Sequence, residues 1–196
     1  MNKLRAYKIL LLLLMISIVI VATFVIIKHV NMYNNEKKLQ TIVTNINEKL
    51  KNSDEIILQI DEKIENYKVV GIIKIPKIDL EYPILEETNK KSLNLSITKF
   101  WGNKINEIGN VSLAGHNNLN GTMFGKIKKL EVGDIIELTD IQNVTLKYQI
   151  FKKYVINPND ISCILPEKEG AKEVTLITCT NGNKNRLVLK AREINI

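Results

Sequence analysis

The sequence predicts a mainly β domain over residues 69–196, built as a barrel or a sandwich of short strands. From Val69 onward the apolar residues occur in short runs, many of them β-branched, and not at the spacing of an amphipathic helix. Turn-forming residues separate these runs. Residues 92–100 and 124–130 are expected to form short helical connections. Strands are expected at residues 69–75, 82–85, 111–114, 135–138, 144–151, 154–156, 174–179 and 187–194.

A charge-free run, residues 9–27, precedes this domain and is interrupted only by Ser17 and Thr23. As a helix at about 1.5 Å per residue it would span roughly 29 Å, close to the ~30 Å hydrocarbon core of a bilayer. A cleaved signal peptide is the alternative. However, the run is longer than a typical signal core, and no small-residue cleavage site follows it. Residues 1–30 are therefore expected to form a cytoplasmic tip and a retained single-pass membrane anchor.

The formal net charge of +7 is unevenly distributed along the chain. Residues 1–30 contain Lys3, Arg5, Lys8 and Lys28 but no acidic residue. Most of these charges lie before the apolar run, which predicts a cytoplasmic N-terminus and an extracellular remainder. The other 24 of the 28 basic residues accompany 21 acidic residues, and this balance is too weak to indicate nucleic-acid binding.

Residues 31–68 are highly charged, lack Pro and Gly, and are expected to form an extracellular helical stalk. Apolar residues recur there at alternating spacings of four and three, a heptad pattern in which Ser53 occupies one core position. These residues are Leu39, Val43, Ile46, Leu50, Ile57, Ile60, Ile64 and Tyr67. Because the pattern covers barely four heptads, it favours a stripe that packs on the following domain or the membrane surface over a coiled-coil dimer. Residues 52–55 could alternatively end one helix and cap a second.

The most informative stretch is the expected strand 174–179, which ends on the thiol of Cys179. Residues 180–185 have the composition of a turn, and a second strand begins at Arg186. A hairpin of this kind places Cys179 and Arg186 side by side where the loop opens. A guanidinium beside a thiol favours the thiolate, which is the nucleophilic form of cysteine. Only three of the 28 basic residues are Arg, so an Arg at this position suggests that its planar fork is needed.

His116 is the remaining candidate for acid–base chemistry, because the chain contains only two histidines. His29 lies at the end of the apolar N-terminal run, whereas His116 follows a Gly at the end of the expected strand 111–114. Cys179, His116 and Arg186 would together supply a nucleophile, a general acid and base, and a fixed cation.

Two motifs in this region point to a known family. Residues 175–179 read TLITC with Arg186 downstream, and residues 114–116 read AGH, followed by a Gly-x-x-Phe segment at residues 121–124. Together these motifs resemble those of the sortases, the membrane-anchored cysteine transpeptidases of Gram-positive bacteria. The resemblance covers residues 69–194 and implies the closed β-barrel with short helices that this family uses.

The resemblance also bears on the class of sortase. The segment between two expected strands, residues 157–172, is short, which disfavours the long inserted helix of the haem-protein-anchoring class B. No Asp-Pro-aromatic lid of the pilin-polymerising class C is visible upstream of the barrel. A class A-like or D-like sortase is therefore favoured.

The resemblance implies transpeptidation of surface proteins that carry an LPxTG-like sorting signal. Cys179 would attack the carbonyl between Thr and Gly, Arg186 and a backbone N–H would hold the oxyanion, and His116 would protonate the departing amine. An amine of a peptidoglycan stem or cross-bridge, or a Lys of another protein, would then resolve the thioester. A membrane-tethered cysteine peptidase or thioesterase would use the same three residues. A non-enzymatic anchored assembly module is the third alternative.

No cofactor is expected, although Ca²⁺ modulates some sortases. Glu86, Glu87 and the acidic residues between positions 159 and 173 could supply oxygen ligands, but adjacent acids favour a solvated surface. Cys163 is interpreted as a half-buried small apolar residue. We expect no disulfide, because pairing with Cys163 would consume the thiol of Cys179.

Overall fold

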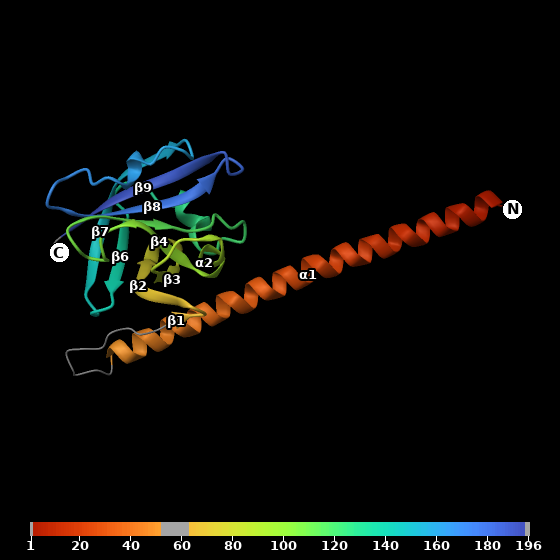
Figure 1. Cartoon of the computed structure of the whole chain (residues 1–196), viewed down its shortest axis with the longest axis horizontal. Coiled ribbons are helices and arrows are strands. Elements are labelled where there is room, and N and C mark those ends of the chain that lie inside the picture. Colours follow the sequence, from red (N-terminus) through yellow and green to blue (C-terminus); the bar gives the residue numbers. More distant parts are fainter. Residues whose placement is uncertain (1, 52–62, 195–196) are drawn as a thin grey trace. The chain divides into compact units, whose positions relative to one another are not determined.

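A computed structural model of the chain describes residues 2–51 and 63–194 (Figure 1). The chain falls into two compact units, Met1–Lys38 and Leu39–Ile196. The first unit holds the N-terminal part of helix α1 (Asn2–Lys51). The second holds the end of that helix and the strands.

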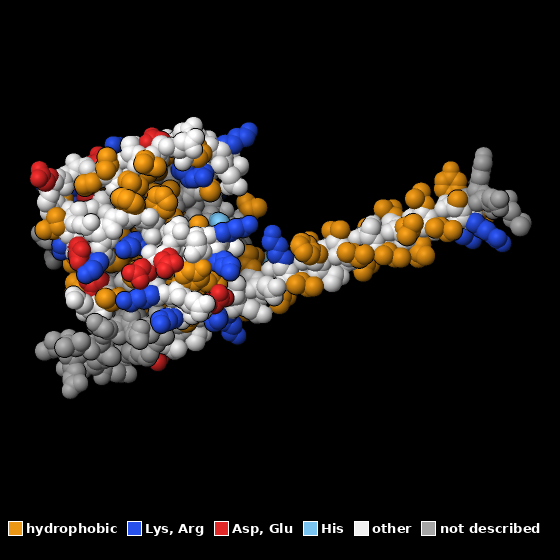
Figure 2. Space-filling view, in the orientation of Figure 1, with side chains coloured by type: hydrophobic (Ala, Val, Ile, Leu, Met, Phe, Trp, Pro, Cys, Tyr) orange, Lys and Arg blue, Asp and Glu red, His pale blue; other side chains and the backbone are white. Residues whose placement is uncertain are grey.

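The N-terminal part of α1 exposes apolar side chains around its circumference. Leu11 and Phe24, for example, are 64% and 69% exposed, and Figure 2 shows apolar side chains along this part of the helix. Such a surface is unfavourable in water, and the helix is long and apolar enough to cross a membrane. It is therefore a candidate for a single membrane span, and it contains the charge-free residues 9–27.

Nine strands of the described residues form one sheet, which closes on itself. Each strand pairs with its neighbours in the order β1-β2-β3-β4-β5-β8-β9-β7-β6, and β6 also pairs with β2. Strands β2 to β9 therefore make an eight-stranded closed barrel, and β1 extends the sheet beside β2. The strands are β1 (Lys63–Ile64), β2 (Tyr67–Ile75), β3 (Leu80–Leu85), β4 (Ile97–Gly102), β5 (Gly109–Ala114), β6 (Ile135–Asp140), β7 (Thr145–Ile156), β8 (Lys172–Thr180) and β9 (Asn185–Glu193). The connecting helices are α2 (Lys90–Leu95), η1 (Pro76–Ile78), η2 (Phe124–Lys129) and η3 (Ser162–Ile164).

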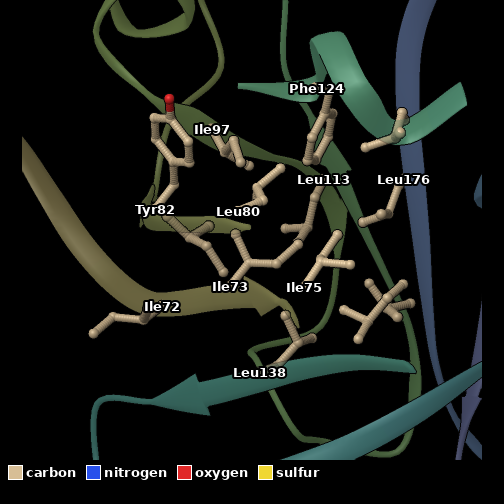
Figure 3. Close-up of a cluster of buried hydrophobic side chains, with 14 of the residues drawn as sticks. Ile72, Ile73, Ile75, Leu80, Tyr82, Ile97, Leu113, Phe124, Leu138 and Leu176 are labelled. Atoms are coloured by element: carbon tan, nitrogen blue, oxygen red, sulfur yellow. The ribbon is translucent and has the colours of Figure 1, made fainter. Parts of the chain in front are cut away.

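Apolar side chains from several walls fill the barrel interior (Figure 3). Ile73 on β2, Leu113 on β5 and Leu138 on β6 converge there. Each of them is 0% exposed, as is Leu176 on β8. Burying one side chain of this size stabilises the fold by about 1.5–3 kcal/mol. This interior holds β5 and β8, the two strands that lead to the candidate site, in a fixed register.

The predicted mainly β fold with short helices is confirmed, and the predicted helical connection at residues 124–130 corresponds to η2. Two strands that the sequence predicts as separate form one continuous strand in the structure. The structure has a single strand β7 where the sequence suggests separate strands at residues 144–151 and 154–156. A bulge between Ile150 and Lys152 shifts the pairing with β9 and lets the strand continue past two lysines.

The predicted helix at residues 92–100 is wrong in its second half. Helix α2 ends at Leu95, and strand β4 begins at Ile97. The side chains of Asn89 and Ser92 form a capping box that starts this short helix. Most of the residues that follow α2 are β-branched or aromatic, and such residues favour a strand.

The predicted helical stalk over residues 31–68 is wrong at its C-terminal end. Within the described residues α1 ends at Lys51, and β1 pairs antiparallel with the start of β2. The turn between them contains Glu65 at a φ of 56°, a left-handed conformation that no helix continues. Ile64 and Tyr67 therefore belong to paired strands and not to a heptad core. The expected core positions 53, 57 and 60, and the alternative cap at residues 52–55, lie outside the described residues.

The preceding apolar positions of α1 pack on the barrel. Three of them are 4% exposed or less: Leu39, Val43 and Ile46. The side-chain amide of Gln40 donates to the backbone oxygen of Glu81 on β3 at 3.2 Å, and that of Asn47 donates to the Glu81 carboxylate at 3.0 Å. These contacts agree with the interpretation in which the apolar stripe packs on the following domain.

Candidate active site

Two parallel strands bring His116 and Cys179 to the same edge of the barrel. The pairing of β5 with β8 runs from Gly109 opposite Lys172 to Ala114 opposite Ile177. Each candidate residue lies two positions beyond that last pair. Because parallel strands end at the same edge of a sheet, the chain delivers both side chains to one place.

Hydrogen bonds tie the two chain ends together. The Thr178 hydroxyl donates to the backbone oxygen of Gly115 at 2.7 Å, and the Asn117 side chain donates to the backbone oxygen of Cys179 at 2.8 Å. A Cβ atom at Gly115 would lie 2.9 Å from the ring of Phe124, so only Gly fits before the histidine without a shift of that ring. The backbone and its immediate neighbours therefore set the position of His116 relative to Cys179.

The hairpin of β8 and β9 places Arg186 directly opposite Cys179, which confirms the pairing predicted from the turn composition. Directly opposite residues of an antiparallel pair share one face of the sheet. The chain reverses over residues 181–183, all of which have positive φ angles. Asn and Gly adopt that conformation most readily, so the Asn-Gly-Asn sequence matches the turn that it forms.

The guanidinium of Arg186 is partly fixed by its own loop. Its Nη1 donates to the backbone oxygens of Asn183 and Asn185, both at 3.1 Å. Within residues 2–51 and 63–194, no hydrogen-bond partner is present for Nε or Nη2. One side of the planar fork is thus held in place while the other remains available to a substrate oxygen.

The ring of His116 is held by a residue that the sequence did not single out. Nε2 of His116 lies 3.2 Å from Oδ1 of Asn94, which is part of the short helix α2. An amide oxygen can only accept, so this contact places a proton on Nε2. No spacing or motif signals this role, because Asn94 is 22 residues from His116 and is brought close only by the fold.

Cys179, His116 and Arg186 line one pocket of about 260 Å³ at this edge of the barrel. All three side chains are half-buried. Most of the remaining wall is apolar. Its larger apolar residues are Leu93, Phe100, Ile156, Ile161, Ile164 and Ile177. A pocket with apolar walls and a few convergent polar groups is the usual form of a ligand-binding site.

One wall of the pocket is the segment between β7 and β8, and buried polar contacts anchor it. Lys190 on β9 is 1% exposed, and its ammonium donates to the backbone oxygen of Leu165 at 2.7 Å and lies 3.3 Å from the Glu167 carboxylate. Asn110 donates to the backbone oxygen of Ile164 at 2.8 Å. A hydrogen bond from Lys152, with further help from Lys190, lowers the pKa of Glu167 below its ordinary value. The anchoring charge is therefore present at neutral pH and is lost only as the pH falls below the usual range of a glutamate.

The second cysteine, Cys163, is more buried than expected. It is 3% exposed, and it also lines the pocket. Burial raises the pKa of its thiol, and the nearby Asp160 carboxylate raises it further. Both cysteines are free, in agreement with the prediction that they do not pair. Cys163 therefore forms part of the pocket wall in its protonated, weakly nucleophilic state.

The acidic residues considered as calcium ligands do not gather in the described parts of the chain. No group of three or more His, Cys, Asp or Glu side chains suited to a metal ion occurs within residues 2–51 and 63–194. Glu86 and Glu87 are exposed and follow strand β3.

The chain belongs to the sortase family, since the family model for the sortase domain matches residues 73–194. It is 32% identical to Sortase A of Bacillus anthracis over 123 residues, which are 62% of this chain and 57% of that protein. It is 34% identical to Sortase A of Listeria monocytogenes over 112 residues, which are 57% of this chain and 49% of that protein. The chain thus spans about half the length of these curated relatives.

A solved Sortase D5 transpeptidase from Clostridium perfringens has the same fold. It is 32% identical, with a TM-score of 0.66 over 82% of this chain and 98% of that chain. These relatives are compatible with the class A-like or D-like prediction. In the described structure the segment between β7 and β8 contains only the three-residue helix η3, so no long inserted helix is present there.

The two thiols provide a direct test of the site assignment. Iodoacetamide at neutral pH is expected to label Cys179 at least about tenfold faster than Cys163, because reactivity follows thiolate character and exposure. Peptide mapping of the folded protein by mass spectrometry measures both rates. The two rates should become similar in denaturant. Faster labelling of Cys163 in the folded protein would contradict the assignment.

Proposed function

We propose that this chain is a cysteine transpeptidase that cleaves an LPxTG-like sorting signal and joins the acyl fragment to an amine of the cell wall. Membership of the sortase family supports a transpeptidase that anchors proteins to the cell wall. The observation that carries the proposal is the convergence of Cys179, His116 and Arg186 on one pocket.

In the first half-reaction the thiolate sulfur of Cys179, with His116 in its protonated form, attacks the carbonyl carbon of the Thr in the sorting signal. A C–S bond forms, and the carbonyl π electrons move to the oxygen. The free donors of Arg186, which lies opposite Cys179, stabilise this oxyanion. As the C=O bond re-forms, the C–N bond to Gly breaks, and His116 gives a proton to the departing amine. A thioester on Cys179 remains.

In the second half-reaction the nitrogen of an incoming primary amine attacks the thioester carbon. His116, now neutral, accepts the proton that the amine loses, and Arg186 again stabilises the oxyanion. The C–S bond then breaks and returns the thiolate of Cys179, so that one amide bond has been exchanged for another. Peptidoglycan stems or cross-bridges, and lysines of other proteins, are the amines that we propose as acceptors.

The apolar part of the pocket supports a sorting signal as the acyl donor. Ile161 and Ile164 lie in the anchored segment between β7 and β8, and Ile156 ends β7. These side chains offer an apolar surface to the Leu and Pro of an extended LPxTG-like peptide. The scissile bond would then lie at the polar end of the pocket, between Cys179 and Arg186.

We further propose that α1 anchors the enzyme with its N-terminus in the cytoplasm and the barrel outside. The charge-free stretch of α1 is a candidate single span, and basic residues at positions 3, 5 and 8 precede it without any acid. This topology places the pocket in the compartment that contains surface proteins and cell-wall amines.

Product analysis separates transpeptidation from hydrolysis. The full chain in detergent micelles is incubated with a labelled LPxTG peptide, with and without triglycine, and the species are followed by mass spectrometry. A thioester on Cys179 whose added mass is the fragment ending in Thr is expected, and triglycine should accelerate its release and appear joined to it. Free acid as the only product at every triglycine concentration would identify a hydrolase instead.

Two cysteine variants control this experiment. Cys179→Ala should abolish turnover, while Cys163→Ala should retain most of it, because Cys163 is a buried wall residue. An adduct on Cys163 would show that the site is wrongly assigned. Cell-surface assembly that is undiminished in the Cys179→Ala variant would favour a non-enzymatic assembly module.

Asn94 is expected to act as a positioning residue for His116. Asn94→Ala should lower kcat about fivefold, which corresponds to roughly 1 kcal/mol, the typical net value of one hydrogen bond. KM for the sorting peptide should change little, and Asn94→Asp, which keeps the accepting oxygen, should retain most of the activity. Steady-state kinetics of the peptide reaction measure these effects. The control is Lys91→Ala on the same helix, and unchanged kcat in Asn94→Ala would refute the role.

A further inference from the structure

A second groove lies beside the active-site pocket, along strand β4. It is lined by Phe100 and Trp101, which are 45% and 59% exposed although both belong to the strand. Neighbouring side chains of a regular strand point to opposite faces. A register shift between Lys99 and Trp101 marks a bulge at Phe100, which allows two consecutive aromatic side chains to face outward. We call the depression lined by these residues the β4 groove.

The β4 groove adjoins the active-site pocket. Thr88 and Phe100 line both of them. The Thr88 hydroxyl donates to the backbone oxygen of Lys99 at 2.9 Å, which fixes the segment after β3 against β4. On β4, Thr98 lies opposite Ala114 at the catalytic edge, whereas Trp101 lies opposite Ser112. Because of the bulge, Trp101 is only two residue pairs, or roughly 7 Å, away from that edge.

The strand order places this groove on the side of His116. The strands β4, β5, β8 and β9 are neighbours in that order. Strand β4 carries the groove, and β5 ends two residues before His116. Cys179 lies on β8, and Arg186 lies on β9. The acid–base group thus stands between the groove and the thiol, and the proposed oxyanion donor lies beyond the thiol. An amine that reaches the thioester from the groove would pass the group that has to accept its proton.

The charges of the groove indicate what kind of molecule it takes. Glu86 and Glu87 line it, both are exposed, and neither carboxylate has an ion-pair or hydrogen-bond partner in the described parts of the chain. Lys99 also lines the groove and offsets one of these two charges. Carboxylates and the face of an indole ring both attract cations.

We infer that the β4 groove binds the amine acceptor, and that it selects an acceptor with a second cationic group about three residues from the reacting amine. This inference rests on the proposed function, since only a transpeptidase needs a second substrate beside the thioester. The acyl donor fills the apolar pocket between Cys179 and the segment after β7. The acceptor then enters along β4, and its second cation lies between Trp101 and the two glutamates.

Direct binding can be measured without catalysis, because Trp101 is the single Trp of the chain. The full chain in detergent micelles is titrated with Gly-Gly-Arg-amide and with Gly-Gly-citrulline-amide, which has the same shape but a neutral side chain. The Arg peptide is expected to change the Trp emission saturably, with a Kd at least threefold lower than that of the citrulline peptide. This difference should vanish in 0.5 M NaCl and in the double variant Glu86→Gln, Glu87→Gln.

The same two peptides serve as acceptors in the transpeptidation assay. The Arg peptide should reach half-maximal aminolysis at a concentration at least threefold lower, and Trp101→Ala should reduce this preference to less than twofold. Ile108→Ala is the matched apolar control, because Ile108 is also 59% exposed. Glu169→Gln is the control for the loss of an exposed acid. Thioester formation without acceptor should be unchanged in all of these variants.

The outcomes are distinguishable. Slower thioester formation in Trp101→Ala would show that the groove binds the sorting signal, and it would overturn the inference. A Trp emission that responds equally to both peptides, or to neither, would also overturn it. If no thioester forms in any variant, the proposed function fails, and the emission titration still decides whether the groove binds a cationic peptide.

Discussion

The parallel pairing of β5 with β8 is the constraint on which the candidate site depends. Six residue pairs fix its register, and a slip of one residue would turn Cys179 toward the opposite face of the sheet. Strand β8 also pairs with β9, and the register of this second pairing sets Arg186 opposite Cys179. The buried side chains of Val174 and Leu176, both 0% exposed, hold β8 in the barrel. One buried strand therefore determines where all three groups lie.

The order of the strands bears on how this geometry would serve the proposed two-substrate reaction. Arg186 lies on one side of Cys179, where its free donors would reach a carbonyl oxygen, and His116 lies on the other side. In the proposed mechanism, an amine that leaves or enters beside His116 would exchange its proton there without crossing the acyl group. The proposed donor surface after β7 and the proposed acceptor groove along β4 are two parts of the surface around this site, and Thr88 and Phe100 line both the pocket and the groove.

Much of this site could be predicted because its signals are local. Turn composition at residues 181–183 predicts the hairpin that pairs Cys179 with Arg186, and an apolar strand that ends in Gly-His predicts the place of His116. Asn94 could not be predicted, because a helix of six residues and a long-range contact bring it to the ring. The heptad pattern wrongly predicted a helix at Tyr67. The chain turns at Glu65, whose positive φ angle ends any helix, and Tyr67 pairs with β1 as part of a strand.

The most direct test of the central claim is a crystal structure of the protein after reaction with a sorting-signal peptide that carries a thiol-reactive group at the scissile position. We expect one adduct, on Cys179, with the oxygen that replaces the carbonyl oxygen within about 3.2 Å of Nε or Nη2 of Arg186. His116 should lie on the side from which the Gly amine would depart. An adduct on Cys163 would contradict the account. So would an adduct on Cys179 whose oxygen does not contact Arg186, with the Arg186 guanidinium still bound only to its own loop.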